Sequence, residues 1–113
     1  MTTASKRKGS EAERNVVKYL RRKGWSSAER AYGAGRPDDV GDISGLENVC
    51  IEVKNQKQMD LSGWLRELEV EKKNARATTG AVVHKKKGVA DVAEWYATMP
   101  VAWWVDLLKE AGY

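Results

Sequence analysis

An apolar segment interrupted by charges, VCIEVKNQ from Val49 to Gln56, sets the first condition on the fold of this chain. Side chains alternate across a β-strand, so Val49, Ile51 and Val53 share one face while Glu52 and Lys54 share the other. A strand this apolar is expected at the centre of a sheet covered by helices, where few positions reach water. Solvation of an open sheet surface explains the two charges taken by themselves, but it explains their apolar setting less well.

The residues before this strand allow it to form one half of a hairpin. A short strand is expected over Asp42 to Ser44, and a tight turn after it would bring Asp42 back beside Glu52. Mg²⁺ takes oxygen ligands and needs only one or two protein carboxylates, and the backbone carbonyl of Val53 is a possible further ligand. Lys54 can orient an attacking water or neutralise charge on a phosphate. The segment therefore favours phosphodiester hydrolysis with Mg²⁺, for which Mn²⁺ would substitute.

Hydrophobic periodicity and turn residues predict an α/β domain with the element order αβββαββα, a small mixed β-sheet flanked by helices. The expected elements are a helix over 10–23, strands over 25–32, 42–44 and 49–56, a helix over 61–77 ended by Gly80, strands over 81–84 and 94–98, and a helix after Pro100. Residues 1–8 are polar and basic and are expected to be flexible. The 113 residues suffice for one core, so residues 9–113 are expected to form a single domain.

The charge pattern indicates a polyanionic partner. The net charge is +4 and the pI is about 9.2, and the positive residues gather in clusters at 6–8, 21–23 and 85–87. Each cluster alone can simply solvate a helix face or a loop, but together they favour nucleic acid. A membrane partner is not expected, because the basic helices lack the large apolar face of an interfacial anchor.

The chain has neither an apolar run long enough to span a membrane nor a secretory signal pattern, so an intracellular, cytoplasmic location is expected, of a cell or of a viral host. Its one cysteine, Cys50, lies in the apolar strand and is expected to be a buried reduced thiol.

The pattern D-(x9)-E-V-K made by Asp42, Glu52 and Lys54 resembles the core of the PD-(D/E)XK, or restriction-endonuclease-like, nuclease superfamily. The stretch GSEAERNVVKYLRRKGW, an arginine, the loop GAGRPDDVGDI and then CIEVK are similar in order and spacing to the archaeal-type Holliday junction resolvases of that superfamily. The resemblance covers residues 9 to about 56 well and the C-terminal half only in element order. It implies a single nuclease domain that cuts four-way DNA junctions with Mg²⁺. It also implies a homodimer, and paired cuts on a two-fold symmetric junction agree with one.

The resemblance also implies roles for residues outside the hairpin. By position, Glu13 corresponds to an active-site glutamate of the first helix, Arg14 to the arginine that follows it, and Arg30 to an arginine before the Gly-rich loop. Glu13 has a structural alternative as the glutamate of an S-x-x-E capping box that starts at Ser10. The expected DNA contacts are Arg14, Arg30, Arg36, Lys85, Lys86 and Lys87, with plain solvation as the alternative.

The first metal carboxylate is the open point of this comparison. In the family it usually follows a proline, whereas here Gly41 precedes Asp42, and Pro37 precedes Asp38. Asp42 is favoured because it stands at the onset of a strand, and Asp38 and Asp39 remain alternatives.

The remaining aromatic residues and the histidine are assigned structural positions. His84 is expected to end a strand rather than act as a base, and Trp64 is expected in the core. In the last helix, Val101, Trp104, Val105 and Leu108 are expected to face inward, which leaves Trp103 for a dimer interface or an exposed wedge.

Two other functions are compatible with the sequence. One is an endonuclease of the same chemistry that acts on flap or duplex DNA. The other is a basic nucleic-acid-binding protein that keeps the fold without catalysis.

Overall fold

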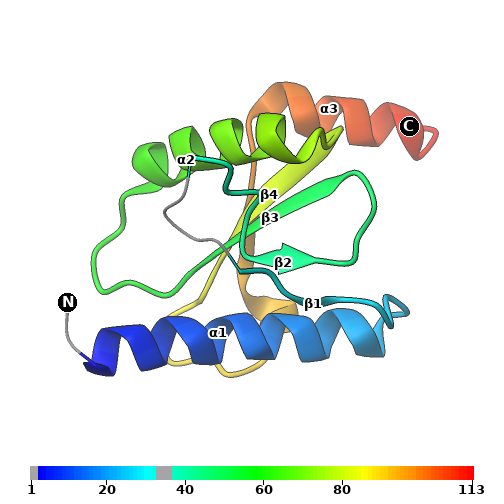
Figure 1. Cartoon of the computed structure of the whole chain (residues 1–113). Helices are drawn as coiled ribbons and strands as arrows, with labels where there is room; N and C mark the ends of the chain where they lie inside the picture. The colour runs from blue at the N-terminus through cyan, green and yellow to red at the C-terminus, as the bar shows by residue number, and fades with distance from the viewer. Residues whose placement is uncertain (1–2, 33–36) are drawn as a thin grey trace.

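A five-stranded sheet lies between helices in the computed structural model, which describes residues 3–32 and 37–113 (Figure 1). The helices are α1 (Thr3–Arg22), α2 (Leu61–Ala75) and α3 (Val101–Glu110), and the strands are β1 (Glu29–Arg30), β2 (Ile43–Ser44), β3 (Val49–Lys54), β4 (Thr79–His84) and β5 (Tyr96–Thr98). A short 3₁₀ helix, η1 (Val92–Glu94), precedes β5. This is the predicted order αβββαββα.

The strands follow one another across the sheet in the order β1-β2-β3-β4-β5. Only the pair β3 and β4 is parallel, because α2 carries the chain back to the start of β4, and the other neighbours are antiparallel. The register places Lys54 opposite His84 at the C-terminal ends of the parallel pair. An open mixed sheet with this order is the predicted restriction-endonuclease-like fold.

Each face of the sheet is covered by its own helix, as Figure 1 shows. Ile51 and Val53 pack against α1, together with Val16 and Val17, so the apolar face of β3 is buried as predicted. Cys50 points to the opposite face, where it packs with α2. Glu52 and Lys54 alternate with the α1-facing residues and therefore lie on the α2 side.

Cys50 is buried and unpaired, as expected of a structural thiol. Its Sγ lies 3.4 Å from the Val40 carbonyl oxygen, to which it donates. Burial raises the pKa of the thiol to about 12, so the side chain stays protonated and inert.

The first helix begins earlier than predicted. It starts at Thr3 rather than at Ser10, so residues 3–8 are helical. The expected capping box is absent, since Ser10 lies inside the helix and its Oγ accepts a hydrogen bond from Arg30 Nη2 at 3.2 Å. The strand expected over 25–32 is also shorter, because only Glu29–Arg30 pair with β2.

The end of α2 differs from the prediction as well. Asp60 caps its start, with Oδ1 accepting from the Gly63 amide at 3.2 Å, but the C-cap is Arg76 in the left-handed conformation at φ 54° and not Gly80. Gly80 lies within β4 opposite Cys50, where an added β-carbon would collide with the Cys50 carbonyl oxygen. Gly80 is therefore required by the close approach of two strands and not by a helix end.

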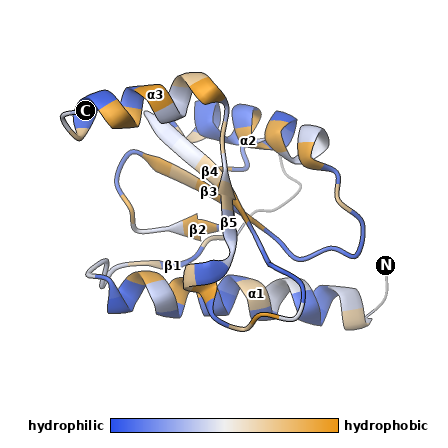
Figure 2. Cartoon of the chain, turned by 180° about the vertical axis from the view of Figure 1, so that it is seen from behind, coloured by the Kyte–Doolittle hydropathy of each residue, from blue (hydrophilic) through white to orange (hydrophobic). Residues whose placement is uncertain are grey.

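The orientation of α3 differs from the prediction at three of the four residues expected to face inward, and the fourth, Leu108, is partly buried. Val101 is 72% exposed, Trp104 54% and Val105 36%, and none of the residues Val101–Glu110, all of them described, is buried. Trp103 instead packs inward against the buried cluster of Cys50, Trp64, Leu68 and Val82, and the centroid of its ring lies 4.7 Å from Lys72 Nζ. Figure 2 shows hydrophobic residues spread around α3, which is why its sequence period left the inward face ambiguous.

Among the residues that the structure describes, no helix has both the length and the hydropathy needed to cross a membrane.

Candidate active site

The β2–β3 hairpin holds Asp42 against the second half of β3. The Asp42 amide donates to the Ile51 carbonyl oxygen at 2.8 Å, and the Val53 amide donates to Asp42 Oδ2 at 2.8 Å. The carboxylate is therefore fixed next to Glu52, which is the convergence that the hairpin predicted.

Gly41 explains why no proline precedes Asp42. Its φ is +103°, which proline cannot adopt, and an added β-carbon would lie 2.8 Å from the Ile51 carbonyl oxygen and 3.2 Å from Cys50 Sγ. A glycine at this position lets the chain pass close over β3 just before it delivers Asp42.

The two alternative aspartates are placed differently. Asp39 Oδ1 accepts from the Gly41 amide at 2.9 Å, and the Asp39 carbonyl oxygen accepts from Asn74 Nδ2 at 2.9 Å. Asp39 thus shapes the loop, although it also borders the same cavity as Asp42, while Asp38 is exposed. The hydrogen bond from Val53 favours Asp42 as the carboxylate that meets Glu52.

Glu52 is a buried carboxylate in an acidic environment. It is 3% exposed, and within the described part of the chain its Oε1 has no hydrogen-bond partner. Burial raises its pKa strongly, and the neighbouring Asp42 and Glu71 raise it further, against the opposing charge of Lys54. A carboxylate in this position favours either a proton or a cation.

Lys54 lies between two carboxylates on the α2 side of β3. Its Nζ is 3.7 Å from Glu52 Oε2 and 3.2 Å from Glu67 Oε2. Burial lowers the pKa of Lys54, but the charges of Glu52 and Glu67 outweigh it, so the net shift is upward and the ammonium stays charged.

Glu13 reaches the site from α1. Its Oε1 accepts from Arg30 Nε at 3.0 Å, so this glutamate is paired across the fold and does not cap its own helix. Burial raises the pKa of Glu13 and so does the nearby charge of Asp42, although Arg30 acts in the other direction.

One cavity of about 750 Å³ brings the predicted catalytic residues together. Its lining includes Glu13, Asp42, Glu52, Val53 and Lys54. Two carboxylates and a backbone carbonyl are hard oxygen donors of the kind that Mg²⁺ prefers, and the unpartnered Oε1 of Glu52 leaves an acceptor to fill. The residues therefore fit a Mg²⁺ site, and their individual roles stay predictions.

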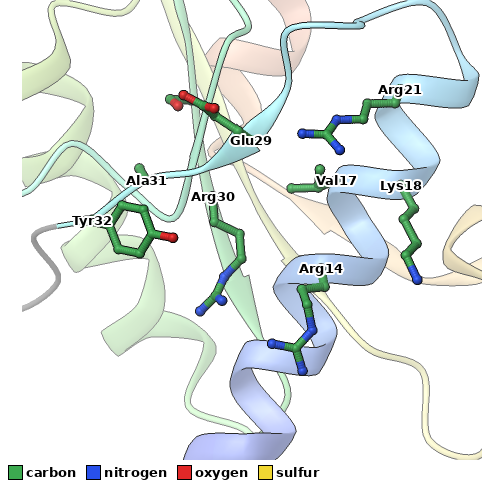
Figure 3. Close-up of a pocket in the computed structure, with 9 residues that line it drawn as sticks. Arg14, Val17, Lys18, Arg21, Glu29, Arg30, Ala31 and Tyr32 are labelled. Atoms are coloured by element: carbon green, nitrogen blue, oxygen red, sulfur yellow. The ribbon is translucent and has the colours of Figure 1, made fainter.

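A second cavity, of about 700 Å³, has four positive side chains among its nine described lining residues. Figure 3 shows Arg14, Lys18 and Arg21 on α1 and Arg30 on β1. Arg14 and Arg30 were predicted, whereas Lys18 was missed, although residues 14, 18 and 21 have the spacing of one helix face. Among the described residues of the lining, Glu29 is the one acidic residue.

The predicted basic turn lies at the end of the parallel strands. Lys85 follows β4 directly, and its amide donates to the Lys54 carbonyl oxygen at 3.1 Å. Lys85, Lys86 and Lys87 therefore extend from the same edge of the sheet as the cavity that holds Lys54. Arg36 lies outside the described residues.

His84 occupies the predicted strand end and does not line the cavity of Asp42 and Glu52. Its Nε2 is 2.8 Å from Thr98 Oγ1, and its ring lies between Trp64 and Tyr96 at centroid distances of 5.7 and 5.4 Å. Burial lowers the pKa of His84, so the ring is neutral near pH 7.

Two glutamates of α2 were missed by the sequence analysis. These are Glu67 and Glu71, which approach Glu52. One carboxylate oxygen of each of these three glutamates lies within 4.8 Å of the other two. Glu71 is 5% exposed, and burial, together with Asp39 and Asp42, raises its pKa to about 7. The signal was present, because Glu71 continues the buried stripe of Trp64 and Leu68 at helical spacing, where a charged residue is unusual.

Comparison with known proteins gives one family match. The family model described as archaeal Holliday junction resolvase (Hjc) matches residues 4–96, from the first turn of α1 to the start of β5. No solved structure matches the chain.

Proposed function

The chain belongs to the archaeal Holliday junction resolvase family, a family of nucleases, and from this premise we propose that it resolves four-way DNA junctions by symmetric, Mg²⁺-dependent phosphodiester hydrolysis. The observation that carries the proposal is the convergence of Asp42, Glu52 and Lys54 in one cavity. A protein that only bound DNA would gain nothing from two adjacent carboxylates, which repel phosphates.

Asp42, Glu52 and the Val53 carbonyl would hold the ion. When bound, Mg²⁺ supplies Lewis acidity at a phosphate oxygen and at a water molecule. The hydrogen bond from Val53 to Asp42 fixes the first carboxylate, and the packing of β3 fixes the second. The protein therefore presents its ligands already oriented, with little rearrangement on binding.

Lys54 is proposed to act on the reacting phosphate. Its ammonium is held by Glu52 and Glu67 at the edge of the cavity, where it can donate to the attacking water or to a phosphate oxygen as negative charge develops. Glu13 borders the same cavity and forms an ion pair with Arg30, which lines the positive cavity of α1 and β1. Arg30 thus links the catalytic cavity to a DNA-binding surface.

The positive cavity of α1 and β1 is proposed to bind the DNA backbone. Arg14, Lys18 and Arg30 lie on it, and Lys85 to Lys87 project from the sheet edge near Lys54. Phosphate contacts of this kind are independent of sequence and sensitive to salt. Selection of a junction would then depend on the shape of the DNA rather than on its bases.

A homodimer is proposed because paired cuts on a two-fold symmetric junction need a pair of sites. The exposed apolar face of α3, formed by Val101, Trp104, Val105 and Leu107, is the surface that we assign to a second copy of the chain. Asp106 and Lys109 of the same helix have opposite charges, which a two-fold contact can pair across the interface. This surface replaces Trp103, which was the sequence-based candidate and packs inward.

The proposal is tested by cleavage of labelled DNA with purified protein. We expect Mg²⁺-dependent cuts at symmetric positions in a four-way junction, and no cutting of a linear duplex made of the same arms. Glu52→Gln should abolish cutting while junction binding persists, and Glu69→Gln, an exposed change on α2, should leave it unchanged.

Other outcomes would identify the alternatives. Equal cutting of junction, flap and duplex would replace the resolvase proposal with a general endonuclease. Binding without cleavage of any DNA in Mg²⁺ or Mn²⁺ would indicate a nucleic-acid-binding protein with a vestigial site. An intracellular location, in a cell or in a viral host, is proposed because that is where the DNA substrate of this family lies.

A further inference from the structure

The carboxylate cluster of β3 and α2, formed by Glu52, Glu67 and Glu71, extends beyond the residues needed for one metal ion. Its three ligand oxygens lie within 4.8 Å of one another, which is the span that a single cation can bridge. Asp42 binds the Val53 amide and is not one of the three. The cluster therefore shares Glu52 with the Asp42 site but adds ligands from another element.

The burial of Glu71 is a separate observation that also points to a bound cation. It is 5% exposed, it comes from the apolar face of α2, and its Oε1 has no hydrogen-bond partner within the described part of the chain. Glu52 Oε1 is buried and unpartnered in the same way. Buried carboxylate oxygens without partners are unfavourable, so a group that satisfies both would stabilise the fold.

The local charges show what kind of group would do so. Glu52 and Glu67 share Lys54, whose Nζ lies 3.7 and 3.2 Å from their Oε2 atoms. When ionised, these three carboxylates and Asp42 carry four negative charges and Lys54 offsets one of them, so two divalent cations would balance the remaining three to within one charge. Oxygen-only ligands favour Mg²⁺, Mn²⁺ or Ca²⁺ over softer metals.

We propose that Glu52, Glu67 and Glu71 form a second divalent-cation position, next to the one assigned to Asp42, Glu52 and Val53. Glu52 would bridge the two positions, and Glu71 would be a ligand supplied by α2 from the buried side. The inference rests on the proposed function for the first position only. Binding at the second position depends on the cluster alone and needs no DNA.

The test counts bound ions without measuring catalysis. The metal-free protein is titrated with Mn²⁺ in the absence of DNA, and the unbound ion is followed by electron paramagnetic resonance. We expect two Mn²⁺ per chain for the unmodified protein, one for Glu71→Gln, and two for the exposed control Glu69→Gln. Asp42→Asn should lose the other ion and keep the one held by the cluster.

A second variant, at an exposed position, keeps the test valid if Glu71→Gln does not fold. Glu67 is half-exposed and does not support the core, so Glu67→Gln should fold and should weaken the second ion on the order of tenfold or more. A single Mn²⁺ in the unmodified protein, or two in Glu71→Gln, would overturn the proposal. Two ions in a protein that cuts no DNA would leave this inference standing and refute the proposed function instead.

Discussion

Replacement of Glu71 by glutamine tests whether the buried acidic cluster destabilises the metal-free fold. The pKa of Glu71 rises from 4.5 to about 7 on folding, mainly because burial disfavours the charged form. Protonated Glu71 therefore favours the folded state, and this contribution is fully present below about pH 4.5 and is lost as the pH rises through about 7.

The magnitude follows from the separation of the two pKa values. Each pH unit between them corresponds to about 1.4 kcal/mol, so ionisation of Glu71 removes on the order of 3 kcal/mol of folding free energy. Glutamine keeps the shape of the side chain but carries no charge. Glu71→Gln should therefore gain stability relative to the unmodified protein as the pH rises from about 4.5 to 8.

The assay is urea unfolding in EDTA across this pH range, followed by tryptophan fluorescence. The difference in free energy of unfolding between Glu71→Gln and the unmodified protein should widen with pH, and saturating Mn²⁺ should narrow it by binding the ionised carboxylate. Glu69→Gln is the control, and its curve should run parallel to that of the unmodified protein. Parallel curves for Glu71→Gln as well would refute the reasoning.

Three further predictions concern other surfaces. Arg14→Ala should weaken junction binding and lower the slope of log K against log salt by about one, since one phosphate contact is lost, whereas Lys73→Ala on α2 should leave the slope unchanged; fluorescence anisotropy over a salt series measures both. Trp104→Glu should convert a dimer to a monomer in analytical ultracentrifugation, whereas Val70→Glu, at a similarly exposed apolar position on α2, should not; a dimeric Trp104→Glu would exclude α3 as the interface. Gly41→Ala should lower the free energy of unfolding by roughly 1 to 3 kcal/mol through its positive φ and its contact with Ile51. Gly88→Ala, which has a positive φ but no atom within 4 Å of the added carbon, should cost less, and equal losses would mean that the contact with Ile51 is harmless.

The sequence determined the parts of the site that are close along the chain. Asp42, Glu52 and Lys54 lie in one hairpin, where the alternation of a strand and the length of a turn are enough to fix which side chains meet. The element order was equally accessible, because its signals are local: a helical period, a capping aspartate at Asp60 and runs of β-branched residues.

Features that depend on which elements pack together could not be predicted from the sequence in the same way. The capping-box pattern around Ser10 is a genuine local signal, but no capping box forms. Ser10 and Glu13 instead accept hydrogen bonds from Arg30 of a different element. Likewise, α3 is apolar on several sides, and only its position against α2 decided that Trp103 faces inward and Trp104 outward.

The cluster of Glu52, Glu67 and Glu71 shows most clearly what the local sequence determines and what only the packing of the elements determines. The sequence marked Glu71 only as a charge on an apolar helix face, since nothing local says what that face will meet. The crossover from β3 to β4 lays α2 over the side of the sheet that carries Glu52 and Lys54, and this packing brings three glutamates within reach of one another. Local spacing set the first carboxylate pair, and long-range packing set the rest of the site.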